Sequence, residues 1–242
     1  MSAAAPEASP APSPGESADA ALGGAVRLLQ PKKGYRFSLD AVLLARFAAE
    51  RPAPRAVDLG CGCGVVGLCL LALGGAQALV GVDVQPDMVD RAARAARGNG
   101  FGERARFLEG DLCRIDGLLP ARSAELVVSN PPYRALGKGR LSASPGASVA
   151  RHEVACRLDD VVSAADHLLG VRGELCLVYP AERAAAAVEA CRRRGLEPRE
   201  LWPVYPGPGA TASLVLFRAV KGAAEGLTVR APLFLHAEGV KY

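Results

Sequence analysis

The sequence has 242 residues, a formal net charge of +4 and a hydrophobic fraction of 50%. That length suits one large α/β domain, and the balance of hydrophobic and charged residues is ordinary for a soluble globular protein. No apolar run reaches the roughly 20 residues that span a bilayer, and the first residues do not form a signal peptide. We therefore expect a cytoplasmic protein without membrane contacts. Its mildly basic charge is compatible with a nucleic-acid partner but does not establish one.

The seven cysteines are an odd number, and none of them form a Cys-x-x-Cys pair. A zinc site would need cysteines and histidines grouped at ligand spacing, so we expect no bound metal. Thiols scattered through apolar segments are typical of free cysteines in a reducing compartment. Cys61 and Cys63 alternate with glycines in a tight turn, where a disulfide between them would obstruct a ligand.

Residues 1–24 are rich in Ala, Pro, Ser and Gly and carry three acidic residues but no lysine or arginine. Such a segment cannot bury enough apolar surface to offset the entropy of ordering. The composition predicts a disordered tail over residues 1–24 and a folded domain over residues 25–242.

The first predicted element of the domain is a helix at 38–51, because apolar residues follow Ser38 at helical spacing. Strands and helices then alternate. Strands are predicted at 56–59, 78–83, 105–109, 125–129, 173–179, 200–204 and 213–219, helices at 65–73, 87–97, 158–169 and 182–194, and an extended segment at 228–235. This alternation is typical of a parallel sheet with helices on both faces, in which ligands bind at the carboxyl ends of the strands.

A glycine loop follows the first of these strands, in the run Asp58-Leu59-Gly60-Cys61-Gly62-Cys63-Gly64. Glycines permit a tight turn and let a ligand approach the backbone closely. Gly62, Gly64 and Gly67 also match the dinucleotide fingerprint, so the loop alone leaves a nicotinamide cofactor open.

Two acidic residues at strand ends, Asp58 and Asp83, favour S-adenosylmethionine, although Asp83 alone fits either cofactor. Asp58 could bind the amino group of this cofactor, directly or through water, whereas it would repel a pyrophosphate. Asp83, followed by Val84, ends the second strand and could accept both ribose hydroxyls. After the third strand, Asp111 could accept a hydrogen bond from the adenine amino group while Leu112 packs on the ring.

The fourth strand is followed by Asn130-Pro131-Pro132-Tyr133. Two prolines hold the backbone extended and remove two donors, which leaves the Asn130 side-chain oxygen and the Pro131 carbonyl as a rigid pair of acceptors. These acceptors suit a planar group with two N–H donors, such as the exocyclic amine of adenine or a glutamine amide. Tyr133 could stack on a flat acceptor, a contact worth about 1–3 kcal/mol for a base. Alignment and polar contacts would then suffice for catalysis.

Together these motifs resemble class I methyltransferases that act on amino nitrogens, and the flanking segments resemble one family more closely. That family is the bacterial tRNA (adenine-N6)-methyltransferases that modify valine tRNA. The similar segments are residues 30–45 (Gln-Pro-Lys-Lys-Gly-Tyr-Arg-Phe-Ser-Leu-Asp-Ala-Val-Leu-Leu-Ala), 150–153 (Ala-Arg-His-Glu), 178–183 (Val-Tyr-Pro-Ala-Glu-Arg) and 199–221. The resemblance covers about residues 26–242.

The resemblance implies a Rossmann-like sheet of seven strands with helices on both faces. It also implies that Tyr35, Phe37 and Ser38 close over the cofactor and that Asp40 helps to position it. The cofactor-binding residues of the family carry over to Asp58, Gly60, Asp83 and Asp111, and its acceptor-binding residues to Asn130, Pro131 and Tyr133.

The leading interpretation is therefore an S-adenosylmethionine-dependent enzyme that forms N6-methyladenosine in tRNA, as a monomer or weak dimer. Methylation of a protein glutamine at N5 is an alternative, although that family usually carries an N-terminal helical domain and only a short segment precedes residue 38 here. Methylation of adenine in ribosomal RNA or DNA also stays open. A non-catalytic cofactor-binding protein and a nicotinamide enzyme complete the alternatives.

Overall fold

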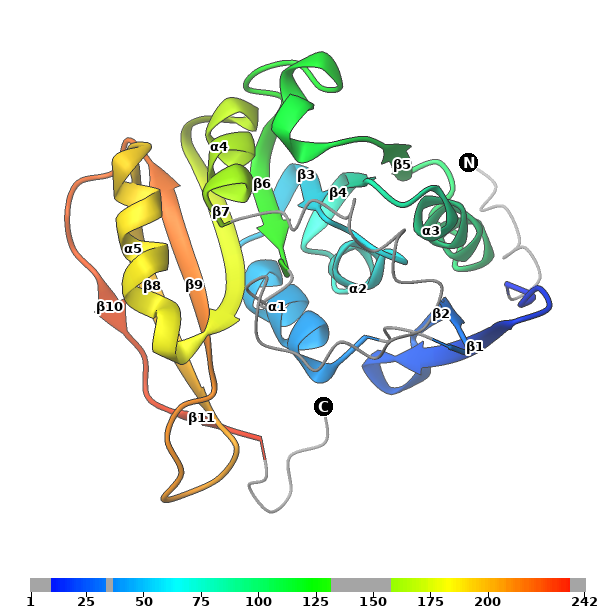
Figure 1. Cartoon of the computed structure of the whole chain (residues 1–242), viewed down its shortest axis with the longest axis horizontal. Coiled ribbons are helices and arrows are strands. Elements are labelled where there is room, and N and C mark those ends of the chain that lie inside the picture. Colours follow the sequence, from blue (N-terminus) through cyan, green and yellow to red (C-terminus); the bar gives the residue numbers. More distant parts are fainter. Residues whose placement is uncertain (1–9, 34–36, 132–157, 236–242) are drawn as a thin grey trace, which may run out of the picture.

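The expected alternation of strands and helices is present in the computed structural model, which describes residues 10–33, 37–131 and 158–235 (Figure 1). The main sheet has nine strands. In spatial order they are β10 (Thr228–Val229), β8 (Leu196–Tyr205), β9 (Leu214–Lys221), β7 (Leu169–Pro180), β6 (Ala124–Ser129), β3 (Ala53–Leu59), β4 (Ala76–Asp83) and β5 (Ala105–Glu109), while β11 (Leu233–Phe234) also pairs with β8.

The sheet is mixed, which corrects the expectation of a purely parallel one. Strands β5, β4, β3, β6 and β7 are parallel neighbours. Strand β9 is antiparallel to both β7 and β8. The physical reason is the connection: β8 and β9 are joined by the loop 206–213, and parallel pairing would require a longer crossover. The seven strands from β8 to β5 form the predicted Rossmann-like sheet, and the short strands β10 and β11 extend it beyond β8.

Helices cover both faces of the sheet. Helices α1 (Leu39–Ala49), α2 (Val65–Ala72) and α3 (Pro86–Gly98) share one hydrophobic cluster with Ala56 of β3 and Val128 of β6. Helices α4 (Leu158–Leu168) and α5 (Ala184–Arg193) share another with the alternate residues Val57 and Val127. Because successive side chains of a strand point to opposite faces, this division shows that the two faces carry separate cores.

An N-terminal hairpin replaces part of the predicted tail. Strand β1 (Glu16–Ala21) pairs antiparallel with β2 (Val26–Pro31) through the short helix η1 (Leu22–Gly24). The prediction of disorder is therefore wrong for residues 10–24, and the predicted boundary at residue 25 falls inside the hairpin. Composition failed here because the buried carboxylate of Glu16 is held by Arg91 and Arg94 of α3, a tertiary contact with no local signature. Residues 1–9 lie outside the described part.

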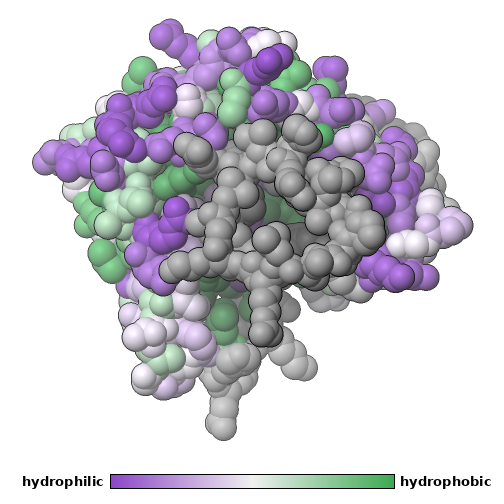
Figure 2. Space-filling view, viewed as in Figure 1, coloured by the Kyte–Doolittle hydropathy of each residue, from purple (hydrophilic) through white to green (hydrophobic). Residues whose placement is uncertain are grey.

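Two further short helices complete the described chain, η2 (Leu112–Gly117) and η4 (Ala181–Arg183). Within the described residues, no helix combines the length and the hydropathy required to cross a membrane. In the orientation of Figure 1, hydrophilic side chains gather along the upper and right-hand margins of the surface, and smaller hydrophobic patches lie between them (Figure 2).

Candidate functional site

The carboxyl ends of four parallel strands meet at one edge of the sheet. Leu59 at the end of β3 pairs with Val82, and Asp83 at the end of β4 pairs with Glu109 at the end of β5. On the other side of β3, Asp58 pairs with Val128, near the end of β6. The register therefore brings the predicted residues Asp58, Asp83, Asp111 and Asn130 to the same edge.

The glycine loop turns from β3 into α2 through three left-handed residues. Gly60, Gly62 and Gly64 have φ angles of 69°, 52° and 81°, which favour glycine strongly. The Gly60 and Cys61 amides donate to the Val82 carbonyl, at 2.9 and 3.1 Å, and so anchor the loop to β4. A Cβ atom on Gly60 or Gly62 would meet nothing within 4 Å, so open space lies beside the backbone at both positions.

Asp58 lies beneath this loop, with only 1% of its surface exposed. Its Oδ2 accepts a hydrogen bond of 3.0 Å from the Gly67 amide in the first turn of α2. Its Oδ1 is buried and has no partner among the described residues. Burial raises the pKa of Asp58 to about 7, against which the Gly67 hydrogen bond acts. The site thus holds a buried carboxylate with one oxygen still able to take a cation or a donor.

Asp83 holds the loop from the end of β4. Its Oδ2 accepts from the Gly62 amide at 2.7 Å, and its Oδ1 accepts from the Gln85 amide at 2.9 Å. Each carboxylate oxygen has a second lone pair, so both can still accept from a diol. The next side chain, Val84, is 59% exposed although it is apolar. An exposed aliphatic group beside a carboxylate suits a nucleoside.

Asp111 and Leu112 follow β5 at the same edge. Asp111 is exposed and caps η2, since its Oδ1 accepts a hydrogen bond of 2.9 Å from the Cys113 amide. Leu112 is buried against the sheet, with 8% of its surface exposed. The capping bond uses Oδ1 of Asp111, and the Cys113 thiol also hydrogen-bonds to this carboxylate.

The acceptor motif begins directly after β6. Asn130 is half-buried and Pro131 is buried, while Pro132 and Tyr133 lie outside the described residues. The sequence reasoning missed Ser129, whose buried hydroxyl donates to the Leu59 carbonyl at 2.7 Å. This bond ties the end of β6 to the end of β3, and so sets the position of Asn130 relative to the glycine loop.

The segment before α1 is held by the N-terminal hairpin. Gln30 of β2 accepts from the Phe37 amide at 2.7 Å through Oε1 and donates to Asp19 at 2.6 Å through Nε2. Gln30 belongs to the family-like segment, but nothing in the sequence indicated this contact. Ser38 occupies the N-cap position of α1, as predicted, yet its side chain makes no capping bond.

Of the two other residues predicted in this segment, the structure describes Asp40 but not Tyr35. Asp40 lies half-buried in the first turn of α1. Tyr35 lies outside the described residues, so its predicted role over the cofactor stays a prediction.

The thiols of the glycine loop are buried and free. Burial raises the pKa of Cys61 well above its usual range and that of Cys63 to about 11. Because the thiolate is the reactive form, both thiols are poor nucleophiles at neutral pH. Oxidation near the cofactor is correspondingly disfavoured.

These features fit S-adenosylmethionine better than a dinucleotide. The unpartnered Oδ1 of Asp58 suits a cationic amino group, and the Asp83 carboxylate with exposed Val84 suits an adenosine. A pyrophosphate would meet two carboxylates at the loop instead of cations.

Comparison with known proteins agrees with this geometry. Residues 56–143 match a family model described as a methyltransferase domain. A tRNA1(Val) (adenine(37)-N6)-methyltransferase from Porphyromonas gingivalis is 30% identical over 155 residues, which are 61% of this chain and 60% of the relative. An enzyme of the same name from Dickeya chrysanthemi is 32% identical over 146 residues, or 60% of this chain and 56% of the relative. The chain thus spans about three fifths of the length of these relatives.

Among solved structures, a predicted O-methyltransferase from Agrobacterium tumefaciens is similar with a TM-score of 0.65 and 28% identity, covering 83% of this chain and 89% of the other. The comparisons confirm the predicted resemblance and the Rossmann-like methyltransferase fold, and they identify S-adenosylmethionine as the cofactor. The similar proteins are named for different acceptor atoms, so the likeness does not decide the acceptor.

Proposed function

We propose that this chain, which carries a methyltransferase domain, transfers a methyl group from S-adenosylmethionine to the exocyclic amine of adenine in tRNA. The observation that carries the proposal is the position of Asn130 and Pro131. They follow β6 at the edge where Asp58 and Asp83 frame the cofactor loop. The resemblance to tRNA adenine methyltransferases supports adenine and tRNA over other planar amines.

When bound, S-adenosylmethionine supplies an electrophilic methyl group on a sulfonium. The Asn130 side-chain oxygen and the Pro131 carbonyl would accept the two N–H donors of the adenine amine. These hydrogen bonds would orient the nitrogen and raise its electron density as it attacks the methyl carbon. The products would be N6-methyladenosine, S-adenosylhomocysteine and one proton. Tyr133 would stack on the base.

The direct test is transfer of a radiolabelled methyl group to unmodified tRNA, with mass spectrometry of the product nucleosides. We expect N6-methyladenosine in tRNA and no labelling of a glutamine-containing release-factor peptide. Ribosomal RNA and DNA substrates serve as parallel arms. Labelling of the peptide alone would replace tRNA adenine by the glutamine alternative, and no labelling of any tRNA would overturn the proposal.

Asn130→Ala should lower kcat by about 10²–10³, the usual loss when one positioned hydrogen-bonding group is removed from a transition state. Cofactor affinity, measured by calorimetry with S-adenosylhomocysteine, should change only a few-fold. Gln77→Ala is the matched control, because Gln77 also carries a side-chain amide but is exposed near the start of β4, at the other end of the strand from Asp83. That variant should keep kcat. Unchanged transfer by Asn130→Ala would refute the catalytic assignment.

A further inference from the structure

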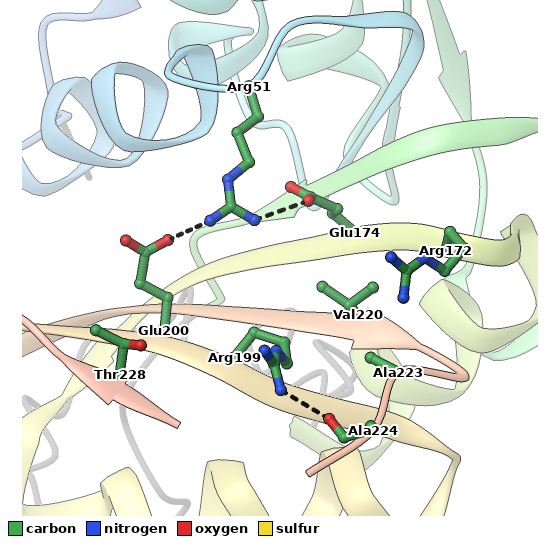
Figure 3. A pocket seen from close by; sticks show the side chains of 9 residues that line it. All are labelled: Arg51, Arg172, Glu174, Arg199, Glu200, Val220, Ala223, Ala224 and Thr228. Carbon is green, nitrogen blue, oxygen red and sulfur yellow. Dashed lines mark hydrogen bonds and ion pairs between the residues drawn. The ribbon is translucent and has the colours of Figure 1, made fainter. Parts of the chain in front are cut away.

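A polar pocket lies away from the glycine loop, toward the opposite end of the sheet. It has a volume of about 590 Å³, and its lining includes Arg51, Arg172, Arg199, Glu174, Glu200 and Thr228 (Figure 3). Glu174 pairs with Leu126 near the start of β6, whereas the cofactor loop follows the ends of the strands. The pocket is therefore separate from the methyl-transfer site.

The carboxylates of this pocket are already neutralised. Arg51 bridges Glu174 and Glu200 at 3.1 and 3.3 Å. Arg218 also contacts both of these carboxylates. Including the neighbours of Glu200, three carboxylates face three guanidinium groups: Glu50, Glu174 and Glu200 against Arg51, Arg218 and Arg230.

Arg172 and Arg199 are left without a carboxylate. The Arg199 Nη1 donates to the Ala224 carbonyl at 2.8 Å, and Arg172 has no hydrogen-bond or ion-pair partner in the described ranges. The nearby Glu197 and Glu225 are both engaged by Arg192. Arg172 of β7 and Arg199 of β8 both line the pocket, and in the view of Figure 3 Val220 lies between them. Two guanidinium charges therefore share one recess without a protein counter-ion among these residues.

The backbone at Arg172 is strained. Its φ angle of 71° lies in the left-handed region, which disfavours any residue with a Cβ atom. A glycine at this position would relieve the strain, and glycines do occupy positions 170 and 173 nearby. Strain of this kind persists where the side chain is needed or where the fold imposes it. The Arg172 guanidinium is therefore a candidate for a functional role.

We propose that Arg172 and Arg199 form a phosphate-binding site, with the Thr228 hydroxyl as a neutral donor. Guanidinium groups bind phosphate oxygens through paired N–H donors, and two of them more than neutralise the single negative charge of a backbone phosphodiester. The pocket has room for the phosphate and its adjoining sugar. The phosphate is that of an RNA backbone; only this choice of source rests on the proposed function.

The test compares Arg172→Gln/Arg199→Gln with wild type by fluorescence anisotropy of labelled, unmodified tRNA at several salt concentrations. We expect the Kd at 0.1 M salt to rise about tenfold and the slope of log K against log salt to shrink by about 1–2. Arg106→Gln is the matched control, because Arg106 is exposed on the edge strand β5 and has no partner in the described part of the chain. It should change the Kd by less than about twofold.

Two additional measurements separate binding from structure and RNA from free phosphate. Arg172→Gly should raise the melting temperature by relieving the backbone, yet weaken tRNA binding as the glutamine variant does. Calorimetry with inorganic phosphate should show binding to wild type that the double variant loses.

Loss of both tRNA and phosphate binding in the double variant supports the proposal with RNA as the source. Loss of phosphate binding with unchanged tRNA affinity supports a site for free phosphate and overturns the RNA source. If neither ligand is affected, the phosphate site is refuted. Failure of methyl transfer to every RNA would refute the proposed function instead, and the phosphate calorimetry would still decide this pocket.

Discussion

The glycine-loop edge and the cluster around Arg218 both contain a buried charged side chain. The two side chains differ in how many of their polar atoms have a hydrogen-bond or ion-pair partner. At the loop, Asp58 has one oxygen bonded to Gly67 and one without a partner in the described residues. In the cluster, the fully buried Arg218 contacts Glu174, Glu200 and the Phe47 carbonyl, the last at 2.7 Å. Its guanidinium also lies 4.6 Å from the Phe47 ring. Complete contacts stabilise the fold, whereas Asp58 keeps one buried oxygen without a partner among the described residues, as expected of a group that binds a ligand.

The largest expected effect is the loss of stability when the complete cluster is broken. Arg218→Ala leaves two carboxylates short of a partner and the Phe47 carbonyl unbonded, so we expect a loss of about 3–5 kcal/mol in the free energy of unfolding. Chemical denaturation measures it. Arg51→Ala is the control, because the Arg51 side chain is 51% exposed, and exposed pairs are worth about 0–1 kcal/mol. Equal losses in the two variants would contradict the distinction between them.

Asp58→Asn should raise the stability of the ligand-free protein, whereas Arg218→Ala lowers stability. The folded state holds the pKa of Asp58 at about 7, mainly through burial, above the 3.8 of an unfolded chain. Its contribution to stability is therefore full below pH 3.8 and is lost as the pH rises through about 7. At pH 8 the neutral amide should stabilise the ligand-free protein by about 1–3 kcal/mol, because it removes a buried charge.

Asp58→Asn should also lower the affinity for S-adenosylhomocysteine at least tenfold, which corresponds to about 1.4 kcal/mol or more. The reason is that a carboxylate binds a cationic amino group better than an amide does. For wild type, calorimetry should show tighter binding at pH 8 than at pH 6, and this pH dependence should vanish in Asp58→Asn. A variant that is less stable and binds as before would mean that Asp58 serves only to hold α2.

A smaller effect is expected where the hairpin meets α3, at another buried and paired charge. The hydrogen bond from Arg94 lowers the pKa of Glu16 to about 2, from a usual 4.5. The stability from this pair is full above pH 4.5 and is lost as the pH falls toward 2. Glu16→Gln should cost about 1–2 kcal/mol at pH 7, and the difference from wild type should shrink by pH 3.

Thermal melts at the two pH values measure the Glu16 effect. Glu125→Gln is the matched control: the Glu125 side chain is 41% exposed and pairs with Arg55 at the surface. That variant should cost less than about 0.5 kcal/mol. An equal loss in both variants would show that the hairpin is not held by its buried carboxylate.

Much of the fold was predictable because each element carried its own signal. The strand at 105–109 and the helix start at 65 match the structure to the residue. The alternation of the chain also predicted which strand ends would share an edge. The hairpin was not predictable, because residues 16–24 look like a polar linker until Arg91 and Arg94 are placed beside Glu16.

The candidate site also contains residues that the sequence predicted and contacts that it could not predict. Asp58, Asp83 and Asn130 could be selected from sequence because they directly follow or end buried strands. The bond from Ser129 to the Leu59 carbonyl and the bond from Phe37 to Gln30 could not, since each joins residues whose proximity depends on the packed sheet and hairpin.

By itself, the sequence determined the cofactor class and the order of strands and helices, because glycine positions, strand-end acids and hydrophobic periodicity act over a few residues. Only the tertiary structure decided which charged side chains have a full set of hydrogen-bond and ion-pair partners. It left one oxygen of Asp58 without a partner, enclosed Arg218 among carboxylates, and set Arg172 and Arg199 apart from any counter-ion in the described chain. The reason is physical: desolvation and charge pairing depend on which groups meet in space, and residues far apart in sequence supply them.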